Sequence, residues 1–217
     1  MSAYKEILQR AQSYQATLVV VSKMQPDEKV MDIYQQGQRI FAENRPQELQ
    51  RKQSSLPVDI QWHLIGNLQK NKIKLILPFV SLIQSVDSFE LASSINDHAT
   101  KINRRSSILL EIKISPEDSK HGIPYHQLVE SLSKDPWSAL SMIDVMGIMS
   151  IGSLCSDQSV TRLEFKSLRQ HFDELKKSGL FGSQFTVLSM GMSSDYQLAL
   201  EEGSNMLRVG SAVFEDK

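Results

Sequence analysis

The sequence predicts a single α/β domain over residues 1–217, folded as a closed (β/α)8 barrel with an additional helix at its N-terminus. Eight short apolar or alternating segments are typical of strands, and a helical pattern follows nearly every one of them. Strict alternation favours a parallel sheet, and eight units are the number that closes such a barrel. An open, doubly wound sheet is the alternative, but no Gly-rich dinucleotide fingerprint follows the first strand. No linker, repeat or shift in composition separates a second domain.

The chain begins with a helix and a buried strand. Residues 2–15 place a few apolar side chains among polar ones, and this helix is expected to complete the outer ring because little chain follows the last strand. Residues 18–23 (LVVVSK) form the apolar, β-branched run of a strand covered on both faces, and Pro26 ends it. A helical pattern over 27–37 follows and ends at Gly37.

The next two units have clear boundaries. A strand over 39–44 leads to a helix over 46–55, which starts with a proline suited to a first helical turn. A strand over 59–65 leads to a basic helix that extends to Leu77, where Pro78 stops it.

The remaining strands share the same short apolar pattern and are expected at 81–86, 107–114, 143–150, 184–190 and 205–209. Asp87 or Ser88 caps the helix that follows the first of these and runs toward Arg104. The later helices are expected at 124–134, at about 159–177 with its end at Gly179, and from a cap at Ser193 or Ser194 to Gly203.

Composition excludes several classes of function. The net charge is −1, with 24 basic and 25 acidic residues and no long run of one sign, so no footprint for nucleic acid or an anionic membrane is present. Cys155 is the single cysteine, which rules out an intrachain disulfide and suits a reducing cytosol. The polar N-terminus is unlike a signal peptide, and no apolar run approaches the ~20 residues that span a bilayer. We expect a cytoplasmic monomer.

Lys23 is the leading candidate for a reactive group. It shares the parity of Val19 and Val21 and is expected to end its strand at the mouth of an apolar pocket. Desolvation there disfavours the ammonium form, which is how lysines become Schiff-base nucleophiles. The structural alternative is a lysine that caps the strand and extends to water. Lys113, which shares a parity with Glu111, is the rival for a buried amine.

Polar residues gather at the C-terminal ends of the predicted strands, where barrels of this kind place their sites. They are Lys23, Glu43, Asn44, His63, Asp87, Ser189, Ser193, Ser194 and Arg208. The last two strands lead into the segments Ser189–Asp195 (SMGMSSD) and Arg208–Ser211 (RVGS). Gly191 permits close backbone approach, and serines at a helix start suit a phosphate. Either segment alone is explained by helix capping, but both at this position of the fold favour a phosphate site.

The histidines give no metal site. His63 follows Trp62 at the end of a strand, where it is either a structural residue or part of an aromatic wall for a flat ring. The others are His98, His121, His126 and His171, and none pairs at i,i+4 or has an acidic partner at a useful spacing.

Several stretches together resemble one family, the pyridoxal-phosphate homeostasis proteins, also called PLP-binding proteins, which are similar to the N-terminal barrel of bacterial alanine racemase. The matching stretches run in order over nearly the whole chain, and the serine–methionine–glycine block is highly specific. They are VVSK (20–23), FAEN (41–44) with QE (47–48), WHLIG (62–66) with LQ (68–69) and NK (71–72), SVDS (85–88), KHGI (120–123), GIM (147–149), LSMGMSSD (188–195) and RVGSAVF (208–214).

This resemblance implies a barrel of the PLP fold type III kind and assigns roles to individual residues. The Schiff-base lysine falls on Lys23. The phosphate-binding groups fall on Ser189 or Ser193 and on Gly210 and Ser211, in loops that also contain Met190 and Gly191. Asn44 and His63 would line the cofactor pocket, and Arg208 would face the phosphate or the pyridine nitrogen. The departures are Arg45-Pro46 in place of a tyrosine-led pair, Lys113 in place of asparagine, and an end close to Phe214.

The resemblance leaves two functions to compare. A racemase on this barrel needs a second acid–base residue from another domain or subunit, and an arginine at the pyridine nitrogen weakens the ring as an electron sink. We therefore expect a non-enzymatic carrier of pyridoxal 5′-phosphate (PLP) that acts in PLP (vitamin B6) homeostasis, with indirect effects on amino- and keto-acid pools and with apo-enzymes as recipients. A weak amino-acid racemase is the alternative. A barrel enzyme for phosphorylated sugars, without PLP, is a third class.

Overall fold

Eight parallel strands form the centre of the molecule in the computed structural model, which describes residues 2–115, 121–134, 137–153 and 157–214. In ring order they are β1 (Thr17–Val21), β2 (Ile40–Glu43), β3 (Gln61–Leu64), β4 (Leu82–Val86), β5 (Ser106–Lys113), β7 (Ile143–Met149), β8 (Val187–Ser189) and β9 (Met206–Val209). All eight neighbouring pairs are parallel, and the pairing of β4 with β5 closes the sheet. The barrel prediction is confirmed, and the open-sheet alternative is wrong. Cys155 and Lys120 lie outside the described residues.

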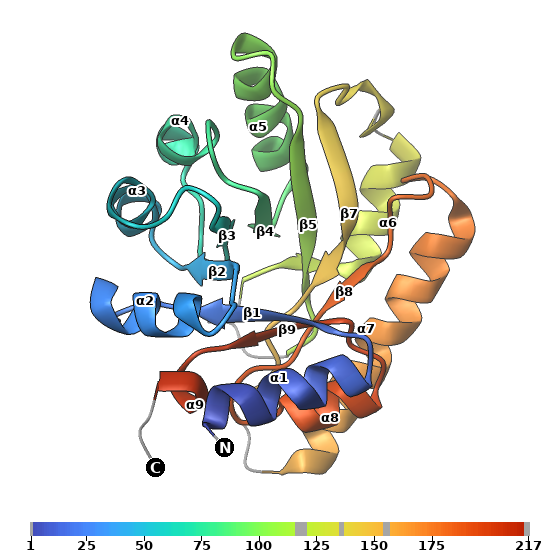
Figure 1. Ribbon diagram of the computed structural model, residues 1–217. Coiled ribbons are helices and arrows are strands. Elements are labelled where there is room, and N and C mark those ends of the chain that lie inside the picture. The colour runs from blue at the N-terminus through green and yellow to red at the C-terminus, as the bar shows by residue number, and fades with distance from the viewer. Residues whose placement is uncertain (1, 116–120, 135–136, 154–156, 215–217) are drawn as a thin grey trace.

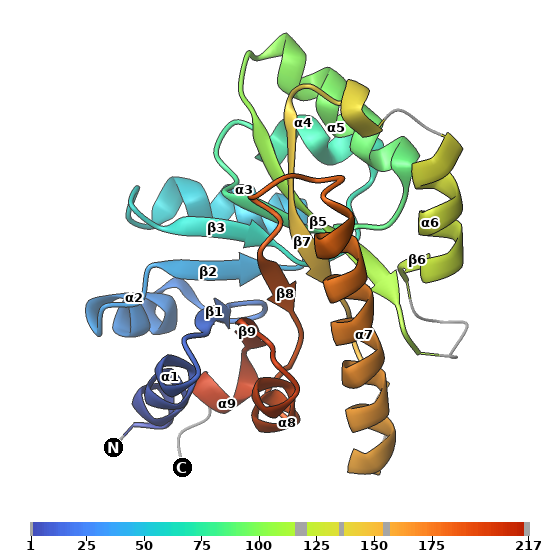
Figure 2. The same ribbon diagram turned by 90° about the vertical axis from the view of Figure 1, so that its right-hand side faces the viewer.

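Helices surround the strands on the outside (Figures 1 and 2). They are α1 (Ala3–Ser13), α2 (Asp27–Gln35), α3 (Pro46–Ser55), α4 (Ile73–Ile76), α5 (Phe89–Lys101), α6 (Tyr125–Lys134), α7 (Gln158–Ser178), α8 (Tyr196–Glu201) and α9 (Ser211–Phe214). In both views α1 lies beside α9, near the two ends of the chain, and its buried residues are Tyr4, Ile7 and Ala11. The N-terminal helix therefore takes the predicted place in the outer ring.

The two faces of each strand belong to different layers. Val19 and Val21 of β1 pack inside the barrel with Ala42, Leu82, Leu109, Met149 and Met206. Leu18 and Val20 face the other way, into the larger core between the strands and the helices. This alternation follows from the two-residue period of a strand. It decides which side chains at the strand ends reach the interior of the barrel.

Some elements differ from those expected. Three short ones were not predicted: β6 (Ile123–Pro124), which pairs with β5, α9, and a 3-10 turn at Trp137–Ala139. The strand expected over 184–190 is reduced to β8, because pairing with its neighbours covers only Val187–Ser189. Ser88, and not Asp87, caps α5, since its hydroxyl accepts the N–H of Leu91. Among the described residues, no helix combines the length and apolar character needed to cross a membrane.

Candidate functional site

A chain of hydrogen bonds crosses the interior of the barrel near the C-terminal ends of the strands. The Arg208 guanidinium donates to Ser189 Oγ at 2.6 Å and to the Ser150 carbonyl at 2.8 Å. Ser189 Oγ donates to Gln84 Oε1 at 2.7 Å, and the amide of Gln84 lies 3.0 Å from His63 Nδ1. Four strands and the loop after β7 thus contribute side chains or backbone to this chain of hydrogen bonds. We call its members Arg208, Ser189, Ser150, Gln84 and His63 the barrel floor.

Burial sets the charges on this floor. Desolvation lowers the pKa of His63 to about 3, so its ring is neutral at physiological pH, and an amide N–H from Gln84 leaves the ring proton on Nε2. Desolvation lowers the pKa of Arg208 to about 10, against the opposing effect of Glu111 and Asp195, and the guanidinium stays charged. Desolvation raises the pKa of Glu111 to about 7. The negative charge of Asp87 adds to this rise, and the positive charge of Arg208 opposes it. Glu111 is 6% exposed and shares the parity of Leu109, which packs inside the barrel, so this residue of β5 faces inward.

The loops after β8 and β9 meet through Ser193. Its hydroxyl accepts the backbone N–H groups of Gly210 and Ala212, both at 3.3 Å. Ser211, between them, begins α9. Two backbone donors thus converge on the Ser193 hydroxyl, at the place where two loops expected to hold a phosphate touch. Ser189, in contrast, lies on the barrel floor with Arg208, so the structure separates two serines that the sequence left as alternatives.

The backbone of the loop after β8 is tightly packed. Gly191 has φ +97°, and a Cβ there would lie 2.5 Å from Ala199 Cβ. Its carbonyl accepts the Arg208 N–H at 3.0 Å, which links the loop to β9. The predicted cap at Ser193 or Ser194 is wrong: α8 begins after Asp195, whose carboxylate accepts the Met192 N–H at 2.6 Å. Ser193 is engaged by Gly210 and Ala212 instead.

Two predicted pocket side chains point away from the interior. Met190 is fully buried in the outer core, because it has the opposite parity to Ser189. Its place in the site is limited to its backbone. Trp62 also faces the outer core, where its ring lies 6.1 Å from that of Phe41. The aromatic wall, which the sequence left as one of two alternatives for His63, is therefore absent from the inner layer formed by the described residues.

Lys23 lies outside β1, contrary to the expectation that it ends the strand. The strand stops at Val21, and Lys23 is an exposed residue of a turn in which the Gln25 N–H donates to the Ser22 carbonyl at 3.0 Å. The Ser22 N–H still donates to the Ala42 carbonyl of β2 at 2.9 Å, and the chain turns directly after it. The predicted burial of the Lys23 amine is thus wrong, because the side chain is exposed. Lys113, at the end of β5, is half-buried.

The sequence interpretation missed a buried ion pair directly under this turn. Lys52 of α3 and Glu43 of β2 are both fully buried, and Lys52 Nζ lies 2.6 Å from Glu43 Oε1. The spacing of Pro46, Leu49 and Lys52 at three-residue intervals, which places all three on the buried face of α3, was the available signal. Gln84 and Ser150 were also missed, because single polar residues within apolar strands carry no motif.

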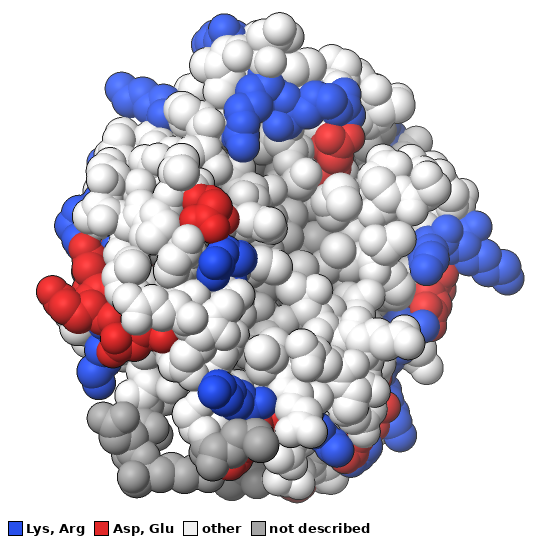
Figure 3. Space-filling view, in the orientation of Figure 1, with Lys and Arg blue, Asp and Glu red and all other residues white. Residues whose placement is uncertain are grey.

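Pockets lie at the rim of the site in the part of the chain that the structure describes. One of about 410 Å³ is lined by Asn44, Arg45, Lys72 and His121 among others. Another of about 550 Å³ is lined by Ser193, Ser194 and residues of α7 and α8. Figure 3 shows charged side chains of both signs around the edge of one face, whose centre is mostly uncharged. Arg45, which departs from the pattern of the resembled family, therefore lies at the pocket rim.

Comparison with known proteins gives a consistent family. Residues 2–217 match the family model described as alanine racemase, N-terminal domain. A curated protein of Aquifex aeolicus named pyridoxal phosphate homeostasis protein is 34% identical over 203 residues, which cover 93% of this chain and 87% of that protein. The human protein of the same name is 35% identical over 216 residues, covering 94% of this chain and 77% of that protein.

Solved structures agree with the sequence comparison. PipY of Synechococcus elongatus, 34% identical, superposes with a TM-score of 0.90 in its structure without PLP, over 99% of this chain and 100% of PipY. The PipY structure described as having PLP bound gives a TM-score of 0.85, over 96% of this chain and 100% of that one. An alanine racemase of Clostridium difficile shares the fold alone, with 14% identity and a TM-score of 0.77 over 99% of this chain and 60% of the racemase.

Proposed function

The chain belongs to the alanine racemase N-terminal domain family, among the pyridoxal phosphate homeostasis proteins, and from this we propose that it binds PLP through Lys23 and takes part in PLP homeostasis. One observation carries the proposal. One end of the barrel contains the accessible Lys23, the buried Arg208 guanidinium, and the amide and hydroxyl groups that converge at Ser193. These are the groups that an aldehyde with a phosphate ester requires.

The residues present fit PLP. When bound, PLP supplies an aldehyde that condenses with an amine, releasing water. Lys23 would provide that amine from its exposed turn. Ser193, Ser211 and the N–H groups of Gly210 and Ala212 would hold the phosphate, since amide donors bind phosphate oxygens well. Met190 and Gly191 would shape the loop through their backbone, and Asn44 would lie at the rim.

The barrel floor would orient the ring. The Arg208 side chain is held at Ser189 and Ser150, so its cation is fixed in place before any ligand arrives. His63 remains neutral and offers a hydrogen-bond donor without adding charge. A fixed guanidinium near a pyridine nitrogen keeps that nitrogen unprotonated, which limits the ability of the ring to store electrons. This property supports a carrier over an efficient catalyst.

The proposal extends to the whole chain. Residues 1–217 would form a single PLP-binding barrel that works in the cytoplasm as a monomer, and PLP-dependent apo-enzymes would receive the cofactor. The family model spans residues 2–217, which supports one unit. The relatives are named homeostasis proteins, which supports a carrier that is not an enzyme. A weak amino-acid racemase remains the second candidate, because the fold is shared with alanine racemases.

A PLP titration of purified protein tests this function. Wild-type protein is expected to develop the visible absorbance of a PLP–lysine adduct, and Lys23→Ala is expected to abolish it. Lys113→Ala is the control, since this rival lysine also lies at a strand end, and it is expected to leave the colour unchanged. Absence of the adduct in wild-type protein would favour a barrel enzyme for phosphorylated substrates without PLP. Loss of colour only in Lys113→Ala would show that PLP is attached to Lys113 instead of Lys23.

A further inference from the structure

The turn that carries Lys23 is held in an unfavourable backbone conformation. Ser22 and Gln25 close it with a backbone hydrogen bond of 3.0 Å, so Lys23 and Met24 are its two central residues. Met24 has φ +63° and is 96% exposed. That conformation at the second central position normally favours glycine or asparagine. Contacts elsewhere must therefore hold the turn in place.

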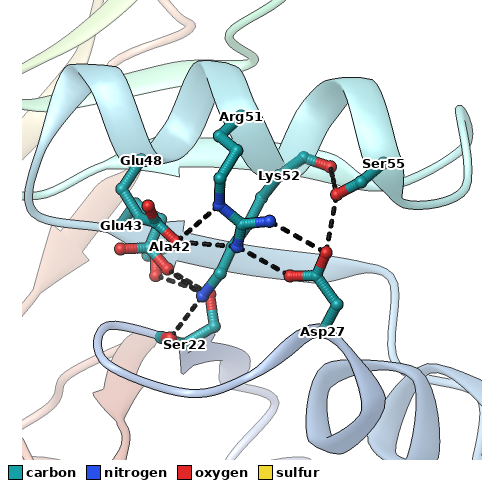
Figure 4. Close-up of polar contacts among 8 residues, drawn as sticks. All are labelled: Ser22, Asp27, Ala42, Glu43, Glu48, Arg51, Lys52 and Ser55. Carbon is teal, nitrogen blue, oxygen red and sulfur yellow. Dashed lines mark hydrogen bonds and ion pairs between the residues drawn. The ribbon is translucent and has the colours of Figure 1, made fainter.

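At one end of the turn, the side chain of Lys52 holds Ser22. Lys52 Nζ donates to the Ser22 carbonyl and to Glu43 Oε1, both at 2.6 Å (Figure 4). Ser22 Oγ donates to the same Glu43 oxygen at 2.8 Å, and the Ser22 N–H donates to the Ala42 carbonyl at 2.9 Å. Ser22, Glu43 and Lys52 are each 0% exposed. Every polar group of the residue before Lys23 is thereby fixed in a site without access to water.

At the other end of the turn, Arg51 of α3 holds Asp27, the first residue of α2. Arg51 binds the Asp27 carboxylate through two N–H groups, at 2.9 Å and 2.7 Å (Figure 4). Ser55 Oγ, one helical turn further along α3, donates to the same carboxylate at 2.8 Å. The segment between Ser22 and Asp27, which includes Lys23, is thus attached to α3 at both ends.

We propose that α3 is a positioning element for Lys23, with Lys52 as its principal residue and Arg51 as its second. The inference rests on the proposed function and deepens it. A fixed turn keeps the Lys23 amine near the aldehyde of a PLP molecule whose phosphate is already held, so bond formation loses little conformational entropy. Lys52 itself is excluded as the attachment site, because its amine is buried and bonded to two oxygens.

Loss of the contacts from Lys52 and Arg51 affects one step of PLP binding, the formation of the covalent bond to Lys23. The phosphate donors at Ser193 and Gly210 lie in the loops after β8 and β9, where they bond to each other, whereas the contacts of Lys52 and Arg51 go to Ser22, Glu43, Asp27 and Glu48. Freeing the turn therefore weakens the covalent bond to Lys23 and leaves anchoring of the phosphate unchanged. Pyridoxine 5′-phosphate, which has an alcohol in place of the aldehyde, separates the two contributions.

The test compares affinities for PLP and pyridoxine 5′-phosphate in three variants of the full chain. In Lys52→Met/Glu43→Gln both buried charges are removed together, because a single substitution leaves an unpaired buried charge that threatens folding. Arg51→Gln removes the exposed ion pairs of Arg51 with Asp27 and Glu48 and leaves the Ser55 bond to Asp27 in place. Arg105→Gln is the matched control: Arg105 also binds an aspartate, Asp144, with similar exposure, but at the opposite, N-terminal end of the strands.

We expect the double variant to bind PLP at least ~10-fold more weakly and Arg51→Gln ~2- to 5-fold more weakly, with unchanged affinity for the analogue in both. Arg105→Gln should match wild-type protein for both ligands. An equal loss of affinity for PLP and for the analogue in the double variant would show a purely structural role and overturn the inference. Unchanged PLP affinity in both α3 variants would also overturn it. If the double variant does not fold, Arg51→Gln decides. Wild-type protein that forms no adduct at Lys23 would instead contradict the proposed function.

Discussion

Glu111 is a buried carboxyl group on the inner face of the barrel whose protonation changes near neutral pH. Desolvation is the main reason that its pKa rises to about 7, and the negative charge of Asp87 adds to the effect. In the unfolded chain its pKa is the ordinary one of about 4.3. Folding therefore favours the protonated form. Its contribution to stability is fully present below the unfolded pKa and is lost as the pH rises through about 7.

Glu111→Gln tests this linkage in the protein without PLP. The amide never ionises, so relative to wild type the variant should gain about 3 kcal/mol in free energy of unfolding between pH 4 and pH 8. Urea unfolding of both proteins across this range measures the difference. His63 and the other titrating groups are common to both proteins and cancel in the comparison. A difference that stays constant with pH would show that Glu111 is not perturbed.

At the scale of single residues, the sequence located the groups at strand ends but misjudged their surroundings. His63, Ser189, Ser193 and Arg208 were predicted as site residues because strand ends in a barrel converge. The structure joins His63, Ser189 and Arg208 through Gln84 in one chain of hydrogen bonds. The expected burial of Lys23 was wrong, since parity describes a strand and β1 stops at Val21. Lys52 was missed because it lies in the polar stretch PQELQRKQSS, where a lysine is typical of a solvated face.

At the scale of elements, the turn after β1 stores strain at Met24. The left-handed conformation costs an L-residue roughly 1–2 kcal/mol, costs a β-branched residue more, and costs glycine little. Met24→Val should therefore be less stable than Met24→Gly by about 1–2 kcal/mol, with the wild type between them. Because the Met24 side chain is almost fully exposed, packing contributes little. Thermal unfolding of the three proteins provides the comparison, and equal stabilities would mean that the turn is not strained.

The loop between β8 and α8 depends on the absence of a side chain at Gly191. A Cβ there would lie 2.5 Å from Ala199 Cβ, in addition to the positive φ. Gly37 has a positive φ of +103°, and a Cβ at Gly37 would have no neighbouring atom within 4 Å, so it is a matched control for the backbone effect alone. Gly191→Ala should be less stable than Gly37→Ala by about 1–3 kcal/mol in urea unfolding. Equal losses would show that the close approach at Gly191 carries no cost of its own.

The order and type of the larger elements followed from sequence because each strand is apolar and each long helix is amphipathic. The boundaries and small elements did not. β6 contains only two residues and α9 only four, too few to show a period. The cap at Asp195 was concealed by two adjacent serines with an equal intrinsic preference for that role. Tertiary contacts, such as those between Ser193 and the end of β9, decided these positions.

At the scale of the whole molecule, a closed barrel brings the first and last strands together, so β1 and β9 are neighbours. This places the Lys23 turn beside the phosphate donors after β9, where a Cβ at Gly210 would lie 3.0 Å from the Val21 carbonyl oxygen. The alternation of eight strand–helix units predicted this closure. The assembly of the site from both ends of the chain is a consequence of the fold.

The carrier proposal predicts low catalytic power for the complete chain. With PLP bound, exchange of the alanine α-proton in deuterated water should be no faster than with the same concentration of free PLP. The expectation follows from the Arg208 cation fixed on the barrel floor. Mass spectrometry or NMR of alanine measures the exchange. Rapid exchange that is lost in Lys23→Ala would establish the racemase alternative.

The most direct measurement locates PLP on the chain. Protein loaded with PLP is reduced with borohydride, digested with trypsin and mapped by mass spectrometry. We expect the mass of a reduced pyridoxyl phosphate group on Lys23, with Lys52 and Lys113 unmodified. A modified peptide from elsewhere, with Lys23 unlabelled, would contradict attachment through Lys23.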